Sequence, residues 1–441
     1  MTFDAISVSA LVKRLVPKGL KRYYHLLWSM AAIARYGNAS KKLIVIGVTG
    51  TDGKTTTTTL IHSILRAAGK RVAMLNGLQF VLPSKQWKNK SDNSTPGKGM
   101  VHAFLAQAEA DGCEYAIIEV TSWGLDQYRL WGIAFDVAVF TNLTYEHLDL
   151  HGTMERYKAA KGKLFQQLAS AVKPGQRKTA IVNADDEAAD YFRSLSPDRT
   201  FTFSLRGAAD FTADGVKTMP VHFTAVEGTA MRQPVDMHLS GEFNVANALA
   251  AAAAARAVGI NWPDIAVGLA AVPGVPGRME FINNGQPFFV IVDFAHTPNG
   301  FRVLFQAARD LVGKDHKVIA VYGATGGRDP GRRPMVGEIA AKMVDFSVLT
   351  SEDPRYENPE DIAKAIETGL NKFGAQSVKD YTFIQDRTDA IRFAVAMAKP
   401  GDAVLLCSMG DYDVMYVGDG KVPWSDREAA KTAIKSLKLG V

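Results

Sequence analysis

The chain has 441 residues, of which 47% are hydrophobic and 22% charged, a balance typical of a soluble globular protein with more than one domain. Its formal net charge is +6, but residues 1–42 hold eight Lys and Arg against a single acid, Asp4, so the other 399 residues sum to −1. A nearly neutral body gives no support for nucleic-acid binding, and the apolar runs are too short for a membrane-spanning helix.

The N-terminus lacks the pattern of a secretory signal, in which a basic stretch precedes an apolar core and a cleavage site. The two cysteines, Cys113 and Cys407, lie in or beside apolar runs typical of buried strands. They predict small core residues in a reducing compartment, with neither a disulfide nor a metal site. We therefore expect a cytoplasmic protein.

Residues 1–40 predict a basic and aromatic segment ahead of the first domain. Between Lys13 and Arg35, basic side chains are interspersed with Leu, Tyr, Trp and Met. One interpretation is a helix at a membrane interface, a peripheral contact in which the basic side chains are attracted to anionic lipid. The other, which we favour, is a helix that packs its aromatic face on the next domain while its basic side chains stay in water.

A strand, a glycine-rich turn and a helix follow one another between residues 43 and 68. The strand is 43–46, and the helix covers 55–68 after the sequence GVTGTDGK. This order is typical of a phosphate-binding loop, in which backbone N–H groups and the helix N-terminus face the phosphates. Lys54 would reach the outer phosphate oxygens, and the Thr55 hydroxyl would bind Mg²⁺. The spacing is irregular, because Val48 stands where the usual motif has its first glycine.

Strands and helices alternate over residues 41–275, which predicts a central domain with a mostly parallel sheet. Residues 200–240 instead alternate polar and apolar side chains, which predicts a small antiparallel insertion. The other elements expected in this domain are three buried strands and one helix, at 115–120, 137–143, 180–183 and 244–257.

The sequence PGVPG at 273–277 is the best candidate linker, and a second α/β pattern follows it over residues 276–441. Short strands alternating with helices predict a Rossmann-like domain with a mostly parallel sheet. Ligands of such sheets bind beyond the carboxyl ends of the strands, where this sequence places its polar clusters. The expected strands are 288–294, 318–322, 346–349, 381–384 and 403–407.

Polar side chains follow the predicted strands of the central domain. Glu119 ends one strand and is well placed to bind Mg²⁺. Asn142 follows the next strand, so its amide can reach a ligand at the same edge. His147 comes shortly after it and fits a metal ligand and a hydrogen-bonded structural residue equally well. The lysines of the predicted helix 157–165 would, from their spacing alone, be solvated charges.

A mixed group of charges lies in the loops of the second domain. Guanidinium groups suit carboxylates and phosphates, and neighbouring acids suit an amine, so a pocket with both would fit a zwitterionic amino acid. The alternative is an ion-pair network that only holds the loops together. The side chains concerned are Arg328, Asp329, Arg332, Arg333, Glu352, Asp353 and Arg355.

Together these stretches resemble the Mur ligase family, the ATP-dependent amide-bond ligases of peptidoglycan synthesis, and within it the members that add the third amino acid. The resemblance runs from about residue 43 to the C-terminus and implies a P-loop ATPase domain followed by a C-terminal ligase domain. The motifs that carry it are GTDGKTT (50–56), EVTS (119–122), TNLTYEHLDLHG (141–152), YKAAKGKLF (157–165), GEFNVANALAA (241–251), PGRME (276–280), VDFAHTP (292–298), GGRDPGRRPMVG (326–337), EDPR (352–355) and WSDREAA (424–430).

The resemblance implies a reaction that uses ATP and Mg²⁺ and serves cell-wall biogenesis, cell shape and cell division. A carboxylate of a muramoyl-peptide precursor would attack the γ-phosphate of ATP, and the amino group of a free amino acid would then displace phosphate from the acyl phosphate. We expect the enzyme to be a monomer. The expected catalytic residues are Lys54, Glu119, His147, Lys161 and Arg278.

The resemblance also assigns binding residues, and it makes Lys161 a carbamate, an anion formed with CO₂ that can bind Mg²⁺. The residues expected to bind ATP are Gly50, Thr51, Asp52, Gly53, Lys54, Thr55, Thr56, Asn142, Asn244, Arg278 and Asp293. The expected metal ligands are Thr55, Glu119, His147 and Lys161. The nucleotide-sugar peptide would be held by Ser94, Thr95, Thr121 and Arg129, and the incoming amino acid by Arg328, Glu352, Asp353 and Arg355.

Several stretches depart from the family pattern. About 40 residues stand where the family carries a uridine-binding domain, so we expect that domain to be absent, and whether the acceptor carries UDP stays open. The family's DNPR motif reads EDPR, and Tyr412 replaces a glutamate that grips the distal amine of diaminopimelate. Which amino acid is added therefore stays open as well. Trp123 and Glu146 replace a histidine and an aspartate of the family.

Two other functions are compatible with these residues. Folylpolyglutamate synthases also lack the uridine-binding domain, although the EDPR and VDFAHTP motifs favour a Mur ligase. The second alternative is a nucleotide-binding, membrane-associated protein that has lost catalysis. The complete set of Lys54, Thr55, Glu119, His147 and Lys161 argues against this second alternative.

Overall fold

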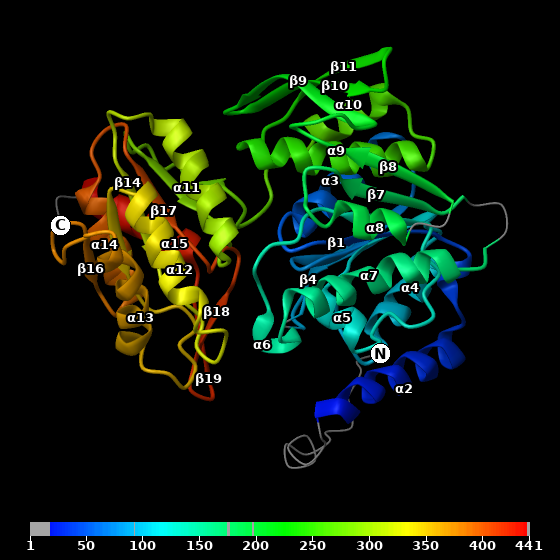
Figure 1. Cartoon of the computed structure of the whole chain (residues 1–441), viewed down its shortest axis with the longest axis horizontal. Helices are drawn as coiled ribbons and strands as arrows, with labels where there is room; N and C mark the ends of the chain where they lie inside the picture. The colour runs from blue at the N-terminus through cyan, green and yellow to red at the C-terminus, as the bar shows by residue number, and fades with distance from the viewer. Residues whose placement is uncertain (1–17, 92, 174–176, 196–197, 439–441) are drawn as a thin grey trace.

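The computed structural model describes residues 18–91, 93–173, 177–195 and 198–438. Figure 1 shows two α/β domains side by side, the central domain in blue to green and the C-terminal domain in yellow to red. The two sheets confirm the fold class expected from the sequence. The predicted linker, residues 273–277, lies between them and contains no helix or strand.

The central domain is built on an eleven-stranded sheet in the order β11-β10-β9-β8-β7-β6-β1-β5-β2-β3-β4. The middle of the sheet, from β9 to β2, is parallel, and antiparallel strands extend it at both edges. The strands are β1 Ile44–Thr49, β2 Val72–Leu75, β3 Gln79–Leu82, β4 Lys85–Lys88, β5 Tyr115–Glu119, β6 Val137–Phe140, β7 Thr179–Asn183, β8 Arg199–Phe203, β9 Phe211–Thr218, β10 Val221–Glu227 and β11 Met231–Asp236.

The buried strands expected at 115–120, 137–143 and 180–183 are present as β5, β6 and β7. The antiparallel strands expected at 200–240 are present as β9, β10 and β11, but the expectation of a separate insertion is wrong, because these strands continue the main sheet. β8 pairs parallel with β7 and β9 pairs parallel with β8, and β10 and β11 then follow in antiparallel pairing. Their polar–apolar alternation arises because the helices α9 (Glu242–Ala257) and α10 (Trp262–Ala270) pack on one face of this extension.

Helices cover both faces of the central sheet. Successive residues of β1 point into opposite cores, as Val45 packs under α4 (Met100–Ala110), α7 (Met154–Ser170) and α8 (Ala189–Ser194). Ile46 packs on the other face, under α3 (Lys54–Ala67), α9 and α10. The helices expected at 55–68, 157–165 and 244–257 are thus confirmed. Two short helices, α5 (Ser122–Asp126) and α6 (Leu148–His151), follow the ends of β5 and β6.

The C-terminal domain has a mostly parallel sheet in the order β12-β13-β17-β14-β15-β16, and its five parallel strands match the expected ones. Helices α11 (Pro298–Val312), α12 (Arg332–Met343) and α13 (Pro359–Lys372) cover one face, and α14 (Arg387–Met397) and α15 (Asp426–Lys438) cover the other. The strands are β12 Glu280–Phe281, β13 Phe289–Val292, β14 Val318–Tyr322, β15 Phe346–Leu349, β16 Tyr381–Phe383 and β17 Ala403–Leu406, with a separate hairpin of β18 Val414–Val417 and β19 Gly420–Pro423.

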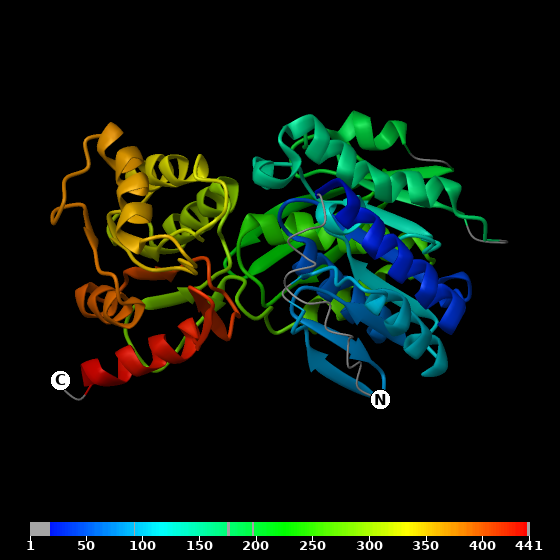
Figure 2. The ribbon, with the colours of Figure 1, turned by 90° about the horizontal axis from the view of Figure 1, so that it is seen from below.

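Helix α2 (Lys18–Tyr36) lies on the outer surface of the central domain, away from the C-terminal domain (Figures 1 and 2). The short turn η1 (Ala39–Lys41) connects it to β1. Packing of this segment on the next domain agrees with the interpretation that we favour from the sequence. Residues 13–17 of the expected helix lie outside the described residues. Within the described part of the chain, no helix is both long enough and apolar enough to cross a bilayer.

The face through which α2 packs is not the aromatic one. Its most buried side chains are small, Ser29 and Ala32, and the Ser29 hydroxyl donates a hydrogen bond to the Tyr128 carbonyl at 3.0 Å. A Cβ atom on Gly99 would overlap Ala32, so the helix lies against the loop that follows residue 95 more closely than larger side chains would allow. The ring of Tyr23, by contrast, is 43% exposed.

Candidate active site

The phosphate loop connects the carboxyl end of β1 to the first turn of α3, near the centre of the sheet. Gly53 precedes α3 in a left-handed conformation (φ 81°). No side chain at this position accepts a hydrogen bond from the first N–H groups of the helix, so these groups can face a phosphate. A Cβ atom on Gly50 would overlap the Thr141 hydroxyl, and one on Gly53 would overlap the Asn247 side chain. Both glycines are therefore required by close contacts.

We expect Gly53→Ala to weaken ATP binding at least about tenfold, or ~1.4 kcal/mol, because the new methyl group must displace Asn247. Gly69→Ala is a matched control, since Gly69 is also left-handed (φ 74°) but has no atom within 4 Å of its Cβ position. Backbone strain should cost both variants about 1–2 kcal/mol of unfolding free energy. Thermal unfolding and calorimetric titration with a non-hydrolysable ATP analogue measure the two effects. Equal affinity in the two variants would contradict the assignment of this loop to ATP.

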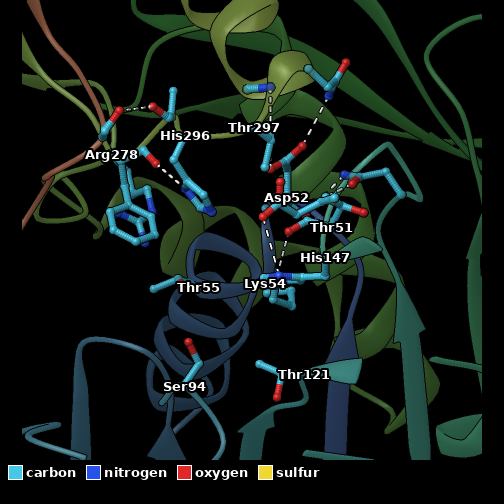
Figure 3. Close-up of a pocket in the computed structure, with 18 of the residues that line it drawn as sticks. Thr51, Asp52, Lys54, Thr55, Ser94, Thr121, His147, Arg278, His296 and Thr297 are labelled. Carbon is cyan, nitrogen blue, oxygen red and sulfur yellow. Dashed lines mark hydrogen bonds and ion pairs between the residues drawn. The ribbon is translucent and has the colours of Figure 1, made fainter. Parts of the chain in front are cut away.

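Two lysines from different helices converge on the phosphate loop. Lys54, drawn in Figure 3, donates from Nζ to the carbonyls of Gly50 at 3.1 Å and Thr51 at 2.6 Å. Lys161 of α7 is 1% exposed and donates from Nζ to the same Gly50 carbonyl at 2.6 Å. Burial, with the charge of Lys54 nearby, holds the pKa of the Lys161 ammonium well below its usual value. The solvated charge expected from spacing alone is therefore wrong for Lys161, whose amine is buried and favours the neutral form.

Glu119 and Thr55 lie together at the same loop. The Thr55 hydroxyl donates to Glu119 Oε2 at 2.8 Å, and the backbone N–H of Gly77 donates to the same oxygen at 2.8 Å. Two oxygen groups beside a phosphate loop fit Mg²⁺, which usually completes its shell with waters and substrate phosphates. The described residues contain no group of three or more His, Cys, Asp or Glu side chains that could hold a metal alone. Such a site would thus depend on nucleotide oxygens as well.

His147 precedes α6 with a left-handed backbone (φ 58°) and faces the cleft. Loss of solvent around the imidazole, with the charge of Lys161 nearby, lowers its pKa well below the usual value, which favours the neutral ring that binds metals. Its Nδ1 lies 3.4 Å from Glu146 Oε1, which is also 3.4 Å from Nη1 of Arg332 in the C-terminal domain. Burial raises the pKa of Glu146 to about 7. His147 therefore stands beside a buried contact between the domains.

The residues expected to hold the acceptor lie at one end of the cleft, where Figure 3 shows Ser94 and Thr121. Thr95 and Arg129 are buried behind them. The Thr95 hydroxyl donates to the Glu119 carbonyl at 2.9 Å and accepts from the Thr121 N–H at 2.9 Å. Nη1 of Arg129 donates to the Thr95 carbonyl at 2.7 Å. These two side chains therefore brace the loop that presents Ser94 to the cleft.

Two asparagines expected to bind ATP, Asn142 and Asn244, are bonded to protein groups. The Asp52 N–H donates to Asn142 Oδ1 at 2.8 Å, and Asn142 Nδ2 donates to the Asp52 carbonyl at 3.1 Å, which fixes the phosphate loop. Asn244 donates to the Ser240 carbonyl at 2.7 Å and accepts from Asn247 at 3.0 Å. Asn247, which was not assigned from the sequence, lines the cleft. Contacts of Asn142 and Asn244 with ATP stay predictions.

Arg278 and Asp293 come shortly after the linker and line the cleft from the C-terminal side. The Asp293 carboxylate accepts two backbone N–H bonds, at 2.5 and 2.6 Å, and burial raises its pKa. The Arg278 guanidinium lies 4.4 Å from the centre of the Phe294 ring. That ring meets Tyr412 edge to face, with centroids 5.1 Å apart. Phe294 thus connects Arg278, which is expected to bind ATP, to the expected amino-acid pocket.

The phosphate loop is bonded directly to the C-terminal domain. Asp52 accepts hydrogen bonds from the Thr297 hydroxyl at 3.4 Å and from Asn299 Nδ2 at 3.2 Å. His296 beside them is half-buried, and loss of solvent around its imidazole lowers its pKa to about 3. None of the three C-terminal residues was assigned from the sequence, although they belong to a polar cluster after a predicted strand. That cluster was the signal that could have identified them.

The charges expected to bind the amino acid lie on the C-terminal side of the cleft and all line it. Asp353 and Arg355 have left-handed backbones (φ 39° and 54°), a strained conformation that is concentrated at binding sites. Burial raises the pKa of Glu352, which accepts from the Thr325 hydroxyl at 3.0 Å. Nη1 of Arg328 lies 3.5 Å from Asp149 of the central domain. This arrangement provides both signs of charge within one pocket.

These groups meet in one cleft of about 480 Å³ between the two domains. The phosphate loop lies in the middle, with the acceptor residues at one end and Arg278 and His296 toward the other (Figure 3). Stretches that are far apart in the sequence therefore form one site. Five expected site residues stay behind the surface of the cleft, namely Gly50, Thr95, Arg129, Lys161 and Asn244.

Comparison with protein-family models gives a match for each of the two domains. Residues 48–255 match the Mur ligase middle domain, and residues 277–410 match the Mur ligase, glutamate ligase domain. The chain belongs to the Mur ligase family. The two matches lie inside the predicted domains, 41–275 and 276–441, whose limits stay predictions.

Curated relatives of this Mur ligase are similar over most of their length. The UDP-N-acetylmuramyl-tripeptide synthetase of Roseiflexus sp. (strain RS-1) is 41% identical, over 93% of this chain and 82% of its own. The UDP-N-acetylmuramoyl-L-alanyl-D-glutamate–2,6-diaminopimelate ligase of Geobacillus kaustophilus (strain HTA426) is 36% identical, over 92% of this chain and 82% of its own. This Mur ligase is an ATP-dependent acid–amino-acid ligase of the same type.

Solved structures agree on the fold. A UDP-N-acetylmuramoyl-L-alanyl-D-glutamate–2,6-diaminopimelate ligase has a TM-score of 0.62 with 28% identity, over 96% of this Mur ligase and 84% of that chain. A folylpolyglutamate synthase of Mycobacterium tuberculosis has a TM-score of 0.66, over 94% and 95% of the two chains, but only 16% identity. The second likeness concerns the fold alone, so the folate alternative gains no support from it.

Proposed function

We propose that this Mur ligase uses ATP to join an amino acid to the carboxylate of a UDP-muramoyl-dipeptide. The observation that carries the proposal is the single cleft, in which the phosphate loop lies between the acceptor residues and the charged C-terminal pocket. The names of relatives at 36–41% identity describe this reaction. Tyr412 lines the cleft, is 43% exposed, and stands where the family has the glutamate that grips diaminopimelate. The identity of the amino acid is therefore left to experiment.

The proposed reaction has two steps. A carboxylate oxygen of the acceptor attacks the γ-phosphorus of ATP, the bond to the bridging oxygen breaks, and ADP and an acyl phosphate form. The amino nitrogen of the second substrate then attacks the acyl carbon, loses a proton, and phosphate leaves from the tetrahedral intermediate. Lys54 and Arg278 would neutralise phosphate charge in the first step. The C-terminal charges would orient the amino acid for the second.

Mg²⁺ would supply further charge neutralisation at the phosphate oxygens. Thr55 and Glu119 would hold one ion, and His147 with a carbamate on Lys161 would hold another. Two features of Lys161 support the carbamate. Burial lowers the pKa of its amine, which increases the share of the neutral form that reacts with CO₂, forming an N–C bond and releasing a proton. The resulting anion would lie close to Lys54 and offset its charge.

We further propose that the enzyme acts as a monomer in the cytoplasm. All residues assigned to the reaction lie in or directly behind one cleft of a single chain, so no second copy is needed to complete it. The two cysteines are free and buried, which suits a reducing, ATP-containing compartment.

The substrate proposal is tested by incubating the protein with ATP, Mg²⁺, UDP-muramoyl-dipeptide and a mixture of amino acids. Mass spectrometry should show the acceptor heavier by one amino-acid residue, and the mass increment identifies that residue. ADP and phosphate should appear in equal amounts. A parallel reaction with a folate acceptor and glutamate tests the alternative that the enzyme is a folylpolyglutamate synthase. The absence of any product from the muramoyl acceptor would refute the proposed substrate.

A further inference from the structure

The outward face of α2 is apolar. Its exposed positions recur at helical spacing, and none of those between residues 23 and 34 carries a charge. Leu27 is 66% exposed and Met30 46%. Surface helices of globular proteins show the opposite arrangement, with polar side chains toward the solvent. We define the α2 outer face by its exposed side chains, Tyr23, Tyr24, Leu27, Met30, Ala31 and Ala34.

Along the sequence of α2, basic residues lie near both ends of the helix, and acidic residues are absent. The sequence of α2 contains Lys18, Lys21 and Arg22 near its start, Arg35 near its end, and no Asp or Glu. Lys98 is exposed in the adjoining loop. An apolar stripe with Lys and Arg around it is typical of a helix that lies among the headgroups of an anionic membrane. The charge pattern therefore favours negatively charged lipid over a neutral surface.

The inner face of α2 fixes the helix in this orientation. The Ser29 hydroxyl donates to the Tyr128 carbonyl at 3.0 Å, and the Lys98 N–H donates to His25 Nδ1 at 3.3 Å. These bonds attach the helix to two stretches that also carry Thr95 and Arg129, the residues that brace the acceptor loop. The helix cannot turn its apolar side inward without breaking them. The α2 outer face therefore stays outward next to the acceptor end of the cleft.

We propose that α2 docks the enzyme on the surface of an anionic membrane, with the α2 outer face inserted among the lipid headgroups. Figure 2 shows the helix along the outside of the central domain. A second copy is a poorer occupant, because two such helices would bring their basic ends together, and like charges across an interface are unfavourable. Docking would hold the acceptor loops close to the bilayer.

Sedimentation of the full chain with lipid vesicles tests the proposal. The protein should bind vesicles that contain phosphatidylglycerol, bind pure phosphatidylcholine weakly, and lose affinity as salt increases. The double variant Leu27→Glu/Met30→Glu should bind at least about tenfold more weakly, because two carboxylates then interrupt the apolar stripe. Val267→Glu is the matched control. Val267 is 61% exposed on α10, at the opposite end of the central domain from α2 (Figure 1), and its substitution should leave binding unchanged.

Ligation activity measured without vesicles separates this proposal from the proposed function. In that assay the double variant should have wild-type activity, and its thermal midpoint should be unchanged. Failure of wild-type protein to bind anionic vesicles, or equal binding by the double variant, would overturn the docking surface. A dimer of the wild-type protein that the same two substitutions dissociate would also overturn it, by assigning the face to a second copy.

Discussion

Lys161→Ala is expected to abolish ligation, with kcat lower by at least about a hundredfold, and acetate in the buffer is expected to restore part of it. The Lys161 side chain is buried, and its Nζ lies 2.6 Å from the Gly50 carbonyl of the phosphate loop. Alanine removes the proposed carbamate and leaves a space that a small carboxylate can enter. Product formation and phosphate release, measured with and without acetate, give both effects. Wild-type activity in Lys161→Ala would exclude the carbamate.

Lys158→Ala is the control on the same helix. Its Nζ lies 5.2 Å from the centre of the Tyr191 ring, and its side chain does not line the cleft. The kcat of this variant should therefore stay within about twofold of the wild-type value. Binding of an ATP analogue and the thermal midpoint show whether Lys161→Ala is still folded. Carbon-13 bicarbonate supplies a direct readout, since a carbamate resonance should appear in the wild-type protein and in Lys158→Ala but not in Lys161→Ala.

Glu119→Gln should raise the Mg²⁺ concentration for half-maximal activity at least about tenfold and lower kcat as well. Glutamine keeps the size of the side chain and can accept the hydrogen bond from the Gly77 N–H, which is 2.8 Å long in the structure. It removes the negative charge that would hold the ion beside Thr55. Phosphate release measured over a range of Mg²⁺ concentrations provides the test.

Glu114→Gln is a matched control at the other end of β5. Glu114 lies 3.6 Å from Lys70 at the protein surface, where an ion pair contributes about 1 kcal/mol or less. The Mg²⁺ dependence of this variant should equal that of the wild-type enzyme. If Glu119→Gln also keeps the wild-type Mg²⁺ dependence, Glu119 is not a metal ligand.

Elements with strong local signals could be predicted from the sequence. The apolar run 43–46, the glycines and Lys54 specify a strand, a turn and a helix by local rules, and the structure has β1 and α3 in those places. β2, β3 and β4 were not predicted, and β4, whose four residues KQWK are all exposed, contains no apolar run that would indicate a strand. The placement of β8 to β11 in the main sheet depends on pairing with β7, which no local pattern encodes.

Some residues of the candidate site could likewise be predicted from the sequence, and others could not. Glu119 and Asn142 could be placed near the nucleotide because the carboxyl ends of neighbouring parallel strands share one edge. Lys161 could not be placed from spacing, because a lysine on a helix is normally solvated and only the packing of α7 beside the phosphate loop buries it. The family resemblance was needed to single it out. Asn247 lies in an alanine-rich helix, and its contact with Thr57 joins segments that are distant in the chain.

The ring of Phe294, held between Arg278 and Tyr412, has a consequence for substrate choice. Gly277 packs so closely on Gly410 that an added Cβ would overlap the backbone, so the linker and the loop that carries Tyr412 must move as one unit. A guanidinium drawn toward a phosphate would shift the ring and reshape the wall of the neighbouring pocket. Under the proposed function, discrimination among amino acids would then be a property of the nucleotide-loaded enzyme, and affinities measured on the empty enzyme would understate it.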